Sequence, residues 1–351
     1  MIEARAYSLW VGRLACSLAV VLAMQGCRSE QRVVYPAQPP VSQPGMTQPG
    51  AAPGAPQGTA QPGAPAPTGP APVAPAPAGP APNAAADPIN RVDVNFLRGR
   101  AQTVLNELVS ALDPAQQQRV QGIPLVFDDS VGEVNAFAAC TSGGRSAMAI
   151  TDGLLDIEAH LAQAQAADEL FGTRKVDAYV QFIARNQRPK QPIVRPPPGF
   201  FDAAASADAR KLTRQAEVLD EQIAFVLGHE LAHHYLGHLP CTQTGAIPTA
   251  EIGHLLSSVI PAFNQPNELA ADVAGTNNVL RVGARRTSGY RLTEGGALLT
   301  MRFFAGLDQA SPVDILFGFE RTHPSPLIRQ PVIAQTAAAF RSTGGALIWP
   351  F

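Results

Sequence analysis

Four of the seven histidines in this chain lie within one ten-residue stretch, HELAHHYLGH, at positions 229–238. His229 lies four residues before His233, and His234 has the same spacing from His238. On an α-helix, side chains four residues apart project from the same side, so two such imidazoles can bind one metal ion. The spacing predicts a metal site without deciding which pair forms it.

The residue after the first histidine of each pair distinguishes the two. A zinc hydrolase also needs a carboxylate beside the metal, which takes a proton from the attacking water. The first pair has Glu230 in this place, whereas the second pair has Tyr235. The HExxH pattern therefore favours His229 and His233 as metal ligands, with Glu230 as the general base.

A third protein ligand is expected, because catalytic zinc usually takes three and leaves one position for water. The metzincin arrangement would need a glycine at position 236 and a histidine at position 239, but both residues are leucine. His238 is about 180° from His229 around a continuous helix, so we expect it to face away from the ion. The third ligand must come from another segment.

The segment NELAADVAG, at positions 267–275, supplies two acids at helical spacing. Glu268 lies 35 residues after His233 and four residues before Asp272. A glutamate from a second helix can complete a zinc site, and an acid one turn later can accept the free imidazole N–H of a ligand histidine. We predict that Glu268 is the third ligand and that Asp272 orients His229.

These segments, together with THPSPLIRQ at 322–330, resemble the sequence blocks of the gluzincin metallopeptidases that include the CAAX prenyl proteases, HtpX and Oma. VNAFAAC, at 134–140, resembles the Asn-Ala-Phe segment of that family, where an edge strand borders the cleft. The resemblance covers residues 92–340. It implies an α+β, zincin-like metallopeptidase domain, mainly helical with a small mixed sheet, and a zinc-dependent endopeptidase with Zn²⁺ as its cofactor.

The resemblance also implies roles for residues outside the two metal segments. His323 is the candidate second donor to the oxyanion of the tetrahedral intermediate, and Arg329 is the alternative. Asn135, Ala136 and Phe137 would bind substrate by strand addition. Because strand addition reads the backbone, it predicts polypeptide substrates of broad sequence, such as unfolded or misassembled proteins of the cell envelope.

Two other functions remain open from the residues alone. The same cleft could hold unfolded envelope proteins with little turnover, as in a lipoprotein chaperone or assembly factor. Glu230 favours an enzyme, because a protein that only binds needs no general base. A structural zinc site would need a fourth protein ligand, and the sequence offers no obvious one near this set.

The expected elements follow from periodicity and turn residues. Apolar residues at helical spacing predict helices, and short apolar runs bounded by Gly, Ser or Asp predict strands, the last two as a hairpin. A basic, proline-rich stretch at 185–201 predicts an irregular surface excursion within an inserted segment near 171–215. The helices are expected at 92–112, 152–170 and 219–239, and the strands at 123–129, 133–140 and 145–151.

The N-terminal quarter of the chain has the composition of an export signal and a linker. Residues 1–26 contain a basic start and a short apolar run, which predict a signal peptide. The sequence MQGC, at 24–27, resembles a bacterial lipobox with Cys27 as the lipidated residue. Residues 27–90 are rich in Pro, Ala and Gly, which predicts a disordered linker. The metallopeptidase domain is expected at 91–351.

Cysteine usage and charge complete the expected setting. With Cys27 lipidated, Cys140 and Cys241 remain in an oxidising compartment, either as a disulfide or as two separate thiols. The formal net charge of −2 gives no reason to expect nucleic acid as a partner. No apolar run after position 30 is long enough to span a bilayer. We therefore expect a periplasmic protein, attached to the outer membrane by a lipid anchor alone.

Overall fold

The computed structural model describes residues 86–248, 251, 264–287, 289–310 and 317–345. The expected signal peptide, Cys27 and nearly all of the linker lie outside these residues. Contacts with the helical body begin at Asp87, and Ile89 is already buried in the core. Within the described ranges, no helix is both long and apolar enough to cross a membrane.

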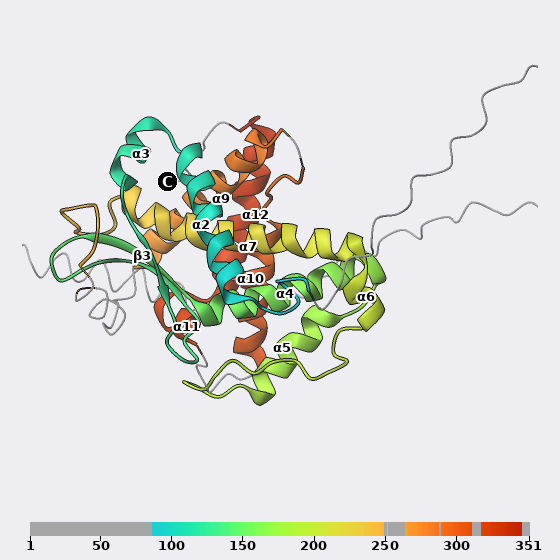
Figure 1. Ribbon diagram of the computed structural model, residues 1–351. Helices are drawn as coiled ribbons and strands as arrows, with labels where there is room; N and C mark the ends of the chain where they lie inside the picture. Colours follow the sequence, from blue (N-terminus) through green and yellow to red (C-terminus); the bar gives the residue numbers. More distant parts are fainter. Residues whose placement is uncertain (1–85, 249–250, 252–263, 288, 311–316, 346–351) are drawn as a thin grey trace, which may run out of the picture. The chain divides into compact units, whose positions relative to one another are not determined.

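Helices form most of the described chain, and a small mixed sheet lies at one end of them (Figure 1). This agrees with the predicted α+β, zincin-like class. In chain order the elements are α2 (Val94–Ala111), α3 (Pro114–Val120), β1 (Leu125–Asp128), β2 (Ala136–Cys140), β3 (Ser146–Thr151), α4 (Asp152–Phe171), α5 (Lys175–Asn186), α6 (Ala203–Ala207), α7 (Ala209–Tyr235), α9 (Gln265–Arg285), α10 (Gly295–Ala310), α11 (Gly318–Thr322) and α12 (Pro326–Ser342).

The three strands follow the order β1-β3-β2, so β2 lies at an edge of the sheet. β1 pairs with β3 in parallel, whereas β2 and β3 form the predicted antiparallel hairpin, with Ala138 opposite Met148. Successive side chains point to opposite faces of a strand. Ala136 and Met148 thus join the main core, while Phe137 joins a second, smaller apolar cluster on the other face.

Helix α7 runs through the middle of the described chain and packs against α2, α4, α9 and α10 (Figure 1, yellow). It begins ten residues before the predicted start, where the side chain of Asp208 accepts a hydrogen bond from the backbone N–H of Arg210. It ends at Tyr235, so the prediction of a helix through position 239 was wrong. All residues from Val218 to Tyr235 are buried, which places the HELAH segment deep inside the domain.

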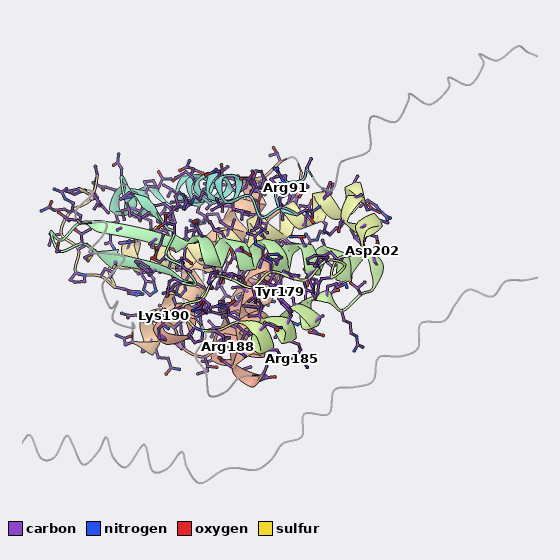
Figure 2. All side chains as sticks on the ribbon, turned by 60° about the horizontal axis from the view of Figure 1, so that its bottom comes forward. Arg91, Tyr179, Arg185, Arg188, Lys190 and Asp202 are labelled. Carbon is purple, nitrogen blue, oxygen red and sulfur yellow. A yellow bond between two sulfur atoms is a disulfide. The ribbon has the colours of Figure 1, made fainter. Side chains whose placement is uncertain are left out.

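The inserted segment near 171–215 forms α5, an irregular stretch, α6 and the first turns of α7. The irregular stretch is fixed to the body by Gln187, whose buried amide accepts from the N–H of Val194 and donates to the carbonyl of Gln191. Phe200 packs edge-on to Tyr179. Figure 2 shows Arg185, Arg188 and Lys190 on the outside of the molecule, with Tyr179 among the helices.

Cys140 and Cys241 form a disulfide, which decides between the two alternatives left open by the sequence. Cys140 is the last residue of β2, and Cys241 lies in the segment that follows α7. Their Cα atoms are 5.3 Å apart, across a sequence separation of 101 residues. The bond therefore ties the edge strand to the chain that leaves the histidine-bearing helix.

Glu158 on α4 is fully buried, and neither of its carboxylate oxygens has a hydrogen-bond partner within the described chain. Burial raises the pKa of this group from 4.5 to about 8. A carboxyl group in such surroundings stays neutral at pH values where the unfolded chain would ionise it. Folding stability must then depend on pH through this residue.

We predict that Glu158→Gln reduces the pH dependence of the free energy of unfolding. In the wild type, Glu158 should make the protein less stable by about 1.4 kcal/mol per pH unit as the pH rises from 4.5 to about 8. Below this window both states are protonated, and above it both are ionised, so its contribution is constant. Urea unfolding across this pH range checks the prediction, and an unchanged slope in the variant would contradict it.

Candidate metal centre

Helices α7 and α9 touch through their backbones where two glycines meet. A Cβ atom on Gly275 would lie 2.9 Å from the backbone nitrogen of His229 and 3.0 Å from the carbonyl carbon of Gly228. A side chain at position 275 would therefore push the helices apart. Glu268 and Asp272 lie seven and three residues before Gly275, so helical periodicity places all three on the face that meets α7.

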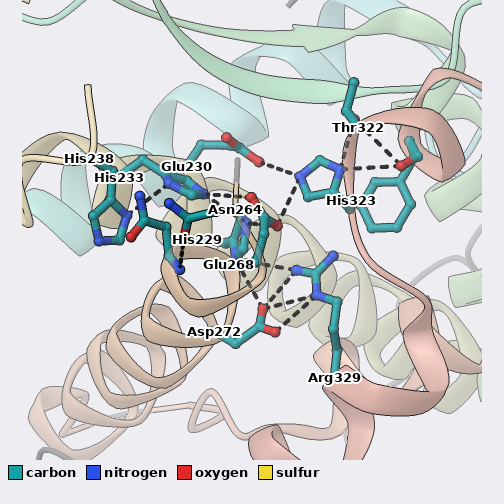
Figure 3. Close-up of polar contacts among 12 residues, drawn as sticks. His229, Glu230, His233, His238, Asn264, Glu268, Asp272, Thr322, His323 and Arg329 are labelled. Atoms are coloured by element: carbon teal, nitrogen blue, oxygen red, sulfur yellow. Dashed lines mark hydrogen bonds and ion pairs between the residues drawn. The ribbon is translucent and has the colours of Figure 1, made fainter. Parts of the chain in front are cut away.

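The structure brings His229, His233 and Glu268 together around one point (Figure 3). The two imidazole Nε2 atoms are 3.2 Å apart. Each is also 3.4 Å from a carboxylate oxygen of Glu268. Atoms that bind one tetrahedral zinc ion at its usual distances are separated by about 3.3 Å. All three separations in this cluster therefore fit a single zinc ion.

The chemistry of Glu268 supports the same conclusion. This side chain is fully buried, and neither of its oxygens has a hydrogen-bond partner within the described chain. Burial opposes its ionisation, but His229, His323 and Arg329 together outweigh this effect and lower the pKa of Glu268 below its ordinary value. An ionised, buried carboxylate needs a cation close to it. Two imidazoles and a carboxylate are a common zinc ligand set.

The other ring nitrogen of His229 is held by a buried ion pair (Figure 3). His229 Nδ1 lies 3.0 Å from Asp272 Oδ1, in agreement with the predicted partnership. Arg329 from α12 binds the same carboxylate, with its Nη2 at 2.7 Å and its Nε at 2.9 Å. Burial opposes the charge of Asp272, but Arg329 and His229 hold its pKa at about 2.

The expected contact of Arg329 with substrate was wrong. Its side chain is 1 % exposed and lies behind His229, where it donates hydrogen bonds to both carboxylate oxygens of Asp272. A side chain without access to the cleft cannot donate to substrate or to an oxyanion. Its position instead makes Arg329 a support for the residue that orients His229.

The second histidine pair lies outside the metal cluster, but His238 contacts one of the proposed ligands. His234 faces away from the cluster, as expected, and its Nε2 lies 3.0 Å from the carbonyl oxygen of Ala147 on β3. His238, however, lies against His233, with 3.0 Å between their Nδ1 atoms. The expectation that His238 faces away assumed a continuous helix. Because α7 ends at Tyr235, the chain turns back and brings His238 beside the cluster.

Glu230 and His323 face each other at the edge of the cluster. His323 Nε2 lies 3.4 Å from Glu230 Oε1 and 4.0 Å from Glu268 Oε2. The other nitrogen of His323, Nδ1, lies 2.8 Å from the hydroxyl oxygen of Thr322. The remaining oxygen of Glu230 is buried and has no hydrogen-bond partner within the described residues. His323, Glu230 and the cluster thus converge on one space.

The predicted substrate segment lies next to this site, and its residues Asn135, Ala136 and Phe137 are buried. The side chain of Asn135 lies 3.4 Å from the hydroxyl of Thr322, next to His323. Asn135 accepts from the backbone N–H of Thr151 on the β3 side. In an antiparallel ladder the bonded direction alternates, so Ala136 and Ala138 direct their backbone groups to the outer edge.

Sequence reasoning missed three features that shape this centre: the glycine crossing, the support by Arg329 and the contact of His238. Gly237 was the readable signal for the last of these, because a glycine just after a helical pattern often ends the helix. Gly228 and Gly275 had no such signal, since their effect requires knowing which helices cross.

A helical fold with a small mixed sheet, in which two helical histidines and a helical glutamate meet beside a buried acid, defines a zincin-like metallopeptidase. The profile of Peptidase family M48 matches residues 98–336, well over half of the chain, and the chain belongs to this family. Comparison with curated proteins and with solved structures found no match.

We predict that metal binding releases about one proton near pH 7. In the metal-free site, burial and Arg329 disfavour the imidazolium of His229, but Asp272 and Glu268 outweigh them and raise its pKa to about 9. A metal ion binds neutral imidazole and displaces this proton, whereas above pH 9 there is little proton to release. Calorimetric zinc titrations in buffers of different ionisation enthalpy measure the release. Asp272→Asn should reduce it, and no release by the wild type would contradict the prediction.

A second prediction concerns the glycine crossing. Gly275→Ala should lower the free energy of unfolding by about 1–3 kcal/mol, because the added methyl group meets the backbone of α7. It should also weaken zinc binding by moving Glu268 away from the histidines. Gly99→Ala on α2 is the matched control, since it has open space around it and should be neutral or slightly stabilising. Equal effects of the two substitutions would refute the role of the crossing.

Proposed function

We propose that this metallopeptidase is a zinc-dependent endopeptidase in which Glu230 is the general base. The observation that carries the proposal is the position of Glu230 beside the His229–His233–Glu268 cluster, with one carboxylate oxygen buried and unbonded within the described chain. A buried acceptor of this kind is suited to take a proton from a water molecule in the cleft. The metal ligands would be His229, His233 and Glu268.

Zinc, when bound, would supply a Lewis acid that polarises the scissile carbonyl and makes water acidic. The chain's own residues do the rest. Glu230 accepts the proton of the attacking water and returns a proton to the leaving amine. Asp272 keeps His229 in the orientation and tautomer that direct its Nε2 to the cluster. Arg329 keeps Asp272 ionised.

His323 is proposed as the donor to the oxyanion. Nδ1 of His323 lies 2.8 Å from the hydroxyl of Thr322 and 3.3 Å from the carbonyl oxygen of Phe319. When the closer partner, the hydroxyl, donates to Nδ1, the proton of the imidazole resides on Nε2, which faces the cluster. The ring is held in place by Phe319, which stacks on it with 4.5 Å between ring centroids. The N–H of Phe319 donates to the carbonyl of Val134, so this donor is fixed relative to the edge strand.

The proposed substrates are extended segments of unfolded or misassembled proteins of the cell envelope. The support is the edge position of β2: Ala136 and Ala138 direct their backbone groups to its outer edge, where a peptide would add as a further strand. Strand addition selects an extended backbone over particular side chains.

The proposed location is the periplasm, with attachment to the outer membrane through lipid on Cys27. The support is the lipobox-like MQGC sequence after a short apolar run and the proline-rich stretch that follows. A polyproline-like linker of this length could hold the domain on the order of 100 Å or more from its anchor.

The proposed function is tested by Glu230→Gln on an unfolded protein substrate with added zinc. We expect kcat to fall by about 10²–10⁴-fold, because the amide cannot take up a proton. Zinc stoichiometry should be unchanged, since Glu230 is not a proposed ligand. Glu217→Gln is the matched control on the same helix, and it should retain activity.

Two results would contradict the proposal. Equal cleavage by wild type and Glu230→Gln would contradict the role of Glu230 as the general base. Binding of zinc and unfolded protein by both, with no cleavage by either, would instead favour a chaperone or assembly factor that uses the same cleft.

A further inference from the structure

The end of helix α7 forms a Schellman motif, which fixes the position of His238. The backbone N–H of His238 donates to the carbonyl of His233 at 3.0 Å, and that of Gly237 donates to the carbonyl of His234 at 3.1 Å. Gly237 has φ +76°, the left-handed conformation that this motif requires and that glycine adopts without strain. The turn therefore brings the residue after Gly237 back over the last turn of the helix.

In most Schellman motifs the residue after the left-handed position makes an apolar contact with the third-last helical residue. Here those two residues are His238 and His233. Their ring centroids are 5.1 Å apart at 66°, and their Nδ1 atoms approach to 3.0 Å. Figure 3 shows His238 beside His233, on the opposite side from Glu268. A contact that is usually apolar is polar in this protein.

The contact involves the ring nitrogen of His233 that faces away from the metal cluster. Nε2 of His233 faces His229 and Glu268, so Nδ1 is the nitrogen that must carry the proton when Nε2 presents its lone pair. A proton on Nδ1 of His233 needs an acceptor. His238 offers the lone pair of its own Nδ1 at hydrogen-bond distance.

We propose that His238 is the positioning residue for His233: it accepts the Nδ1–H of His233 and so fixes the tautomer and ring orientation that direct Nε2 to the metal. The inference rests on the metal site of the proposed function. It gives each ligand histidine its own support, Asp272 for His229 and His238 for His233. The two supports differ in kind, since one is a carboxylate from another helix and the other is an imidazole placed by the end of the same helix.

The test uses three substitutions of His238 that separate the hydrogen bond from the bulk of the ring. Asparagine can place an oxygen near the Nδ1 position, glutamine places its amide further out, near the Nε2 position, and alanine removes both. Zinc affinity is measured by competition with a chromophoric chelator, and ligand geometry by the visible spectrum of the cobalt-substituted protein. Neither measurement requires turnover.

We expect His238→Ala and His238→Gln to weaken zinc binding by about 10–100-fold and to change the cobalt spectrum, whereas His238→Asn should retain most of both. His234→Gln is the matched control, because His234 belongs to the same motif but bonds to Ala147 instead of a ligand. It should leave zinc affinity unchanged. Thermal unfolding of the zinc-free variants shows that each one folds.

Wild-type zinc affinity and spectrum in all three His238 variants would overturn the inference, and so would an asparagine variant as weak as the alanine variant. A wild type that binds no zinc would overturn both this inference and the metal site. Failure of the proposed function is recognised separately, through cleavage by Glu230→Gln at the wild-type rate. In that case a selective loss of zinc by the alanine and glutamine variants would still support the role of His238.

Discussion

Two helix backbones touch where α7 crosses α9, because neither Gly228 nor Gly275 has a side chain there. Packed helices are ordinarily separated by 8–10 Å between their axes, with side chains filling the space. Side chains from both helices must meet around one ion. A wider separation of the helices would leave Glu268 out of reach of the histidines. The spacing of the ligand atoms, at 3.2–3.4 Å, is therefore set by a contact between residues that bind nothing.

The charges of the centre are buried, and this explains why so much of the surrounding chain serves them. An unpaired charge in such a place would lose several kcal/mol of hydration free energy. Asp272 is paired with Arg329 at 2.7 Å and with His229 at 3.0 Å. Within the described chain, Glu268 lies at the longer distance of 3.4 Å from the Nε2 atom of His229. The difference distinguishes the two acids. One is satisfied by the protein and orients a ligand, and the other is left for a cation.

The sequence was sufficient for the parts of the site that depend on helical spacing. HELAH and NELAAD identified His229 with His233 and Glu268 with Asp272, because residues four apart share a helix face. It was insufficient where the chain changes direction. The position of His238 depends on the left-handed turn at Gly237, and that of Arg329 depends on α12 beginning at Pro326, after the cap at Ser325. Because Arg329 follows His323 closely in the sequence, both were predicted to contact substrate. The start of α12 instead places Arg329 behind His229.

The disulfide between Cys140 and Cys241 closes a covalent ring that contains β3 and α4 to α7. His229, His233 and the end of the edge strand all belong to this ring, while Glu268 and His323 lie outside it, on later segments of the chain. The two halves of the centre are thus mechanically unequal. The bond holds the helix that bears His229 and His233 to the edge strand, whereas Glu268 is held by the packing of α9 against α7. The three proposed ligands are therefore held by two different means, a covalent link for the histidine helix and noncovalent packing for the glutamate.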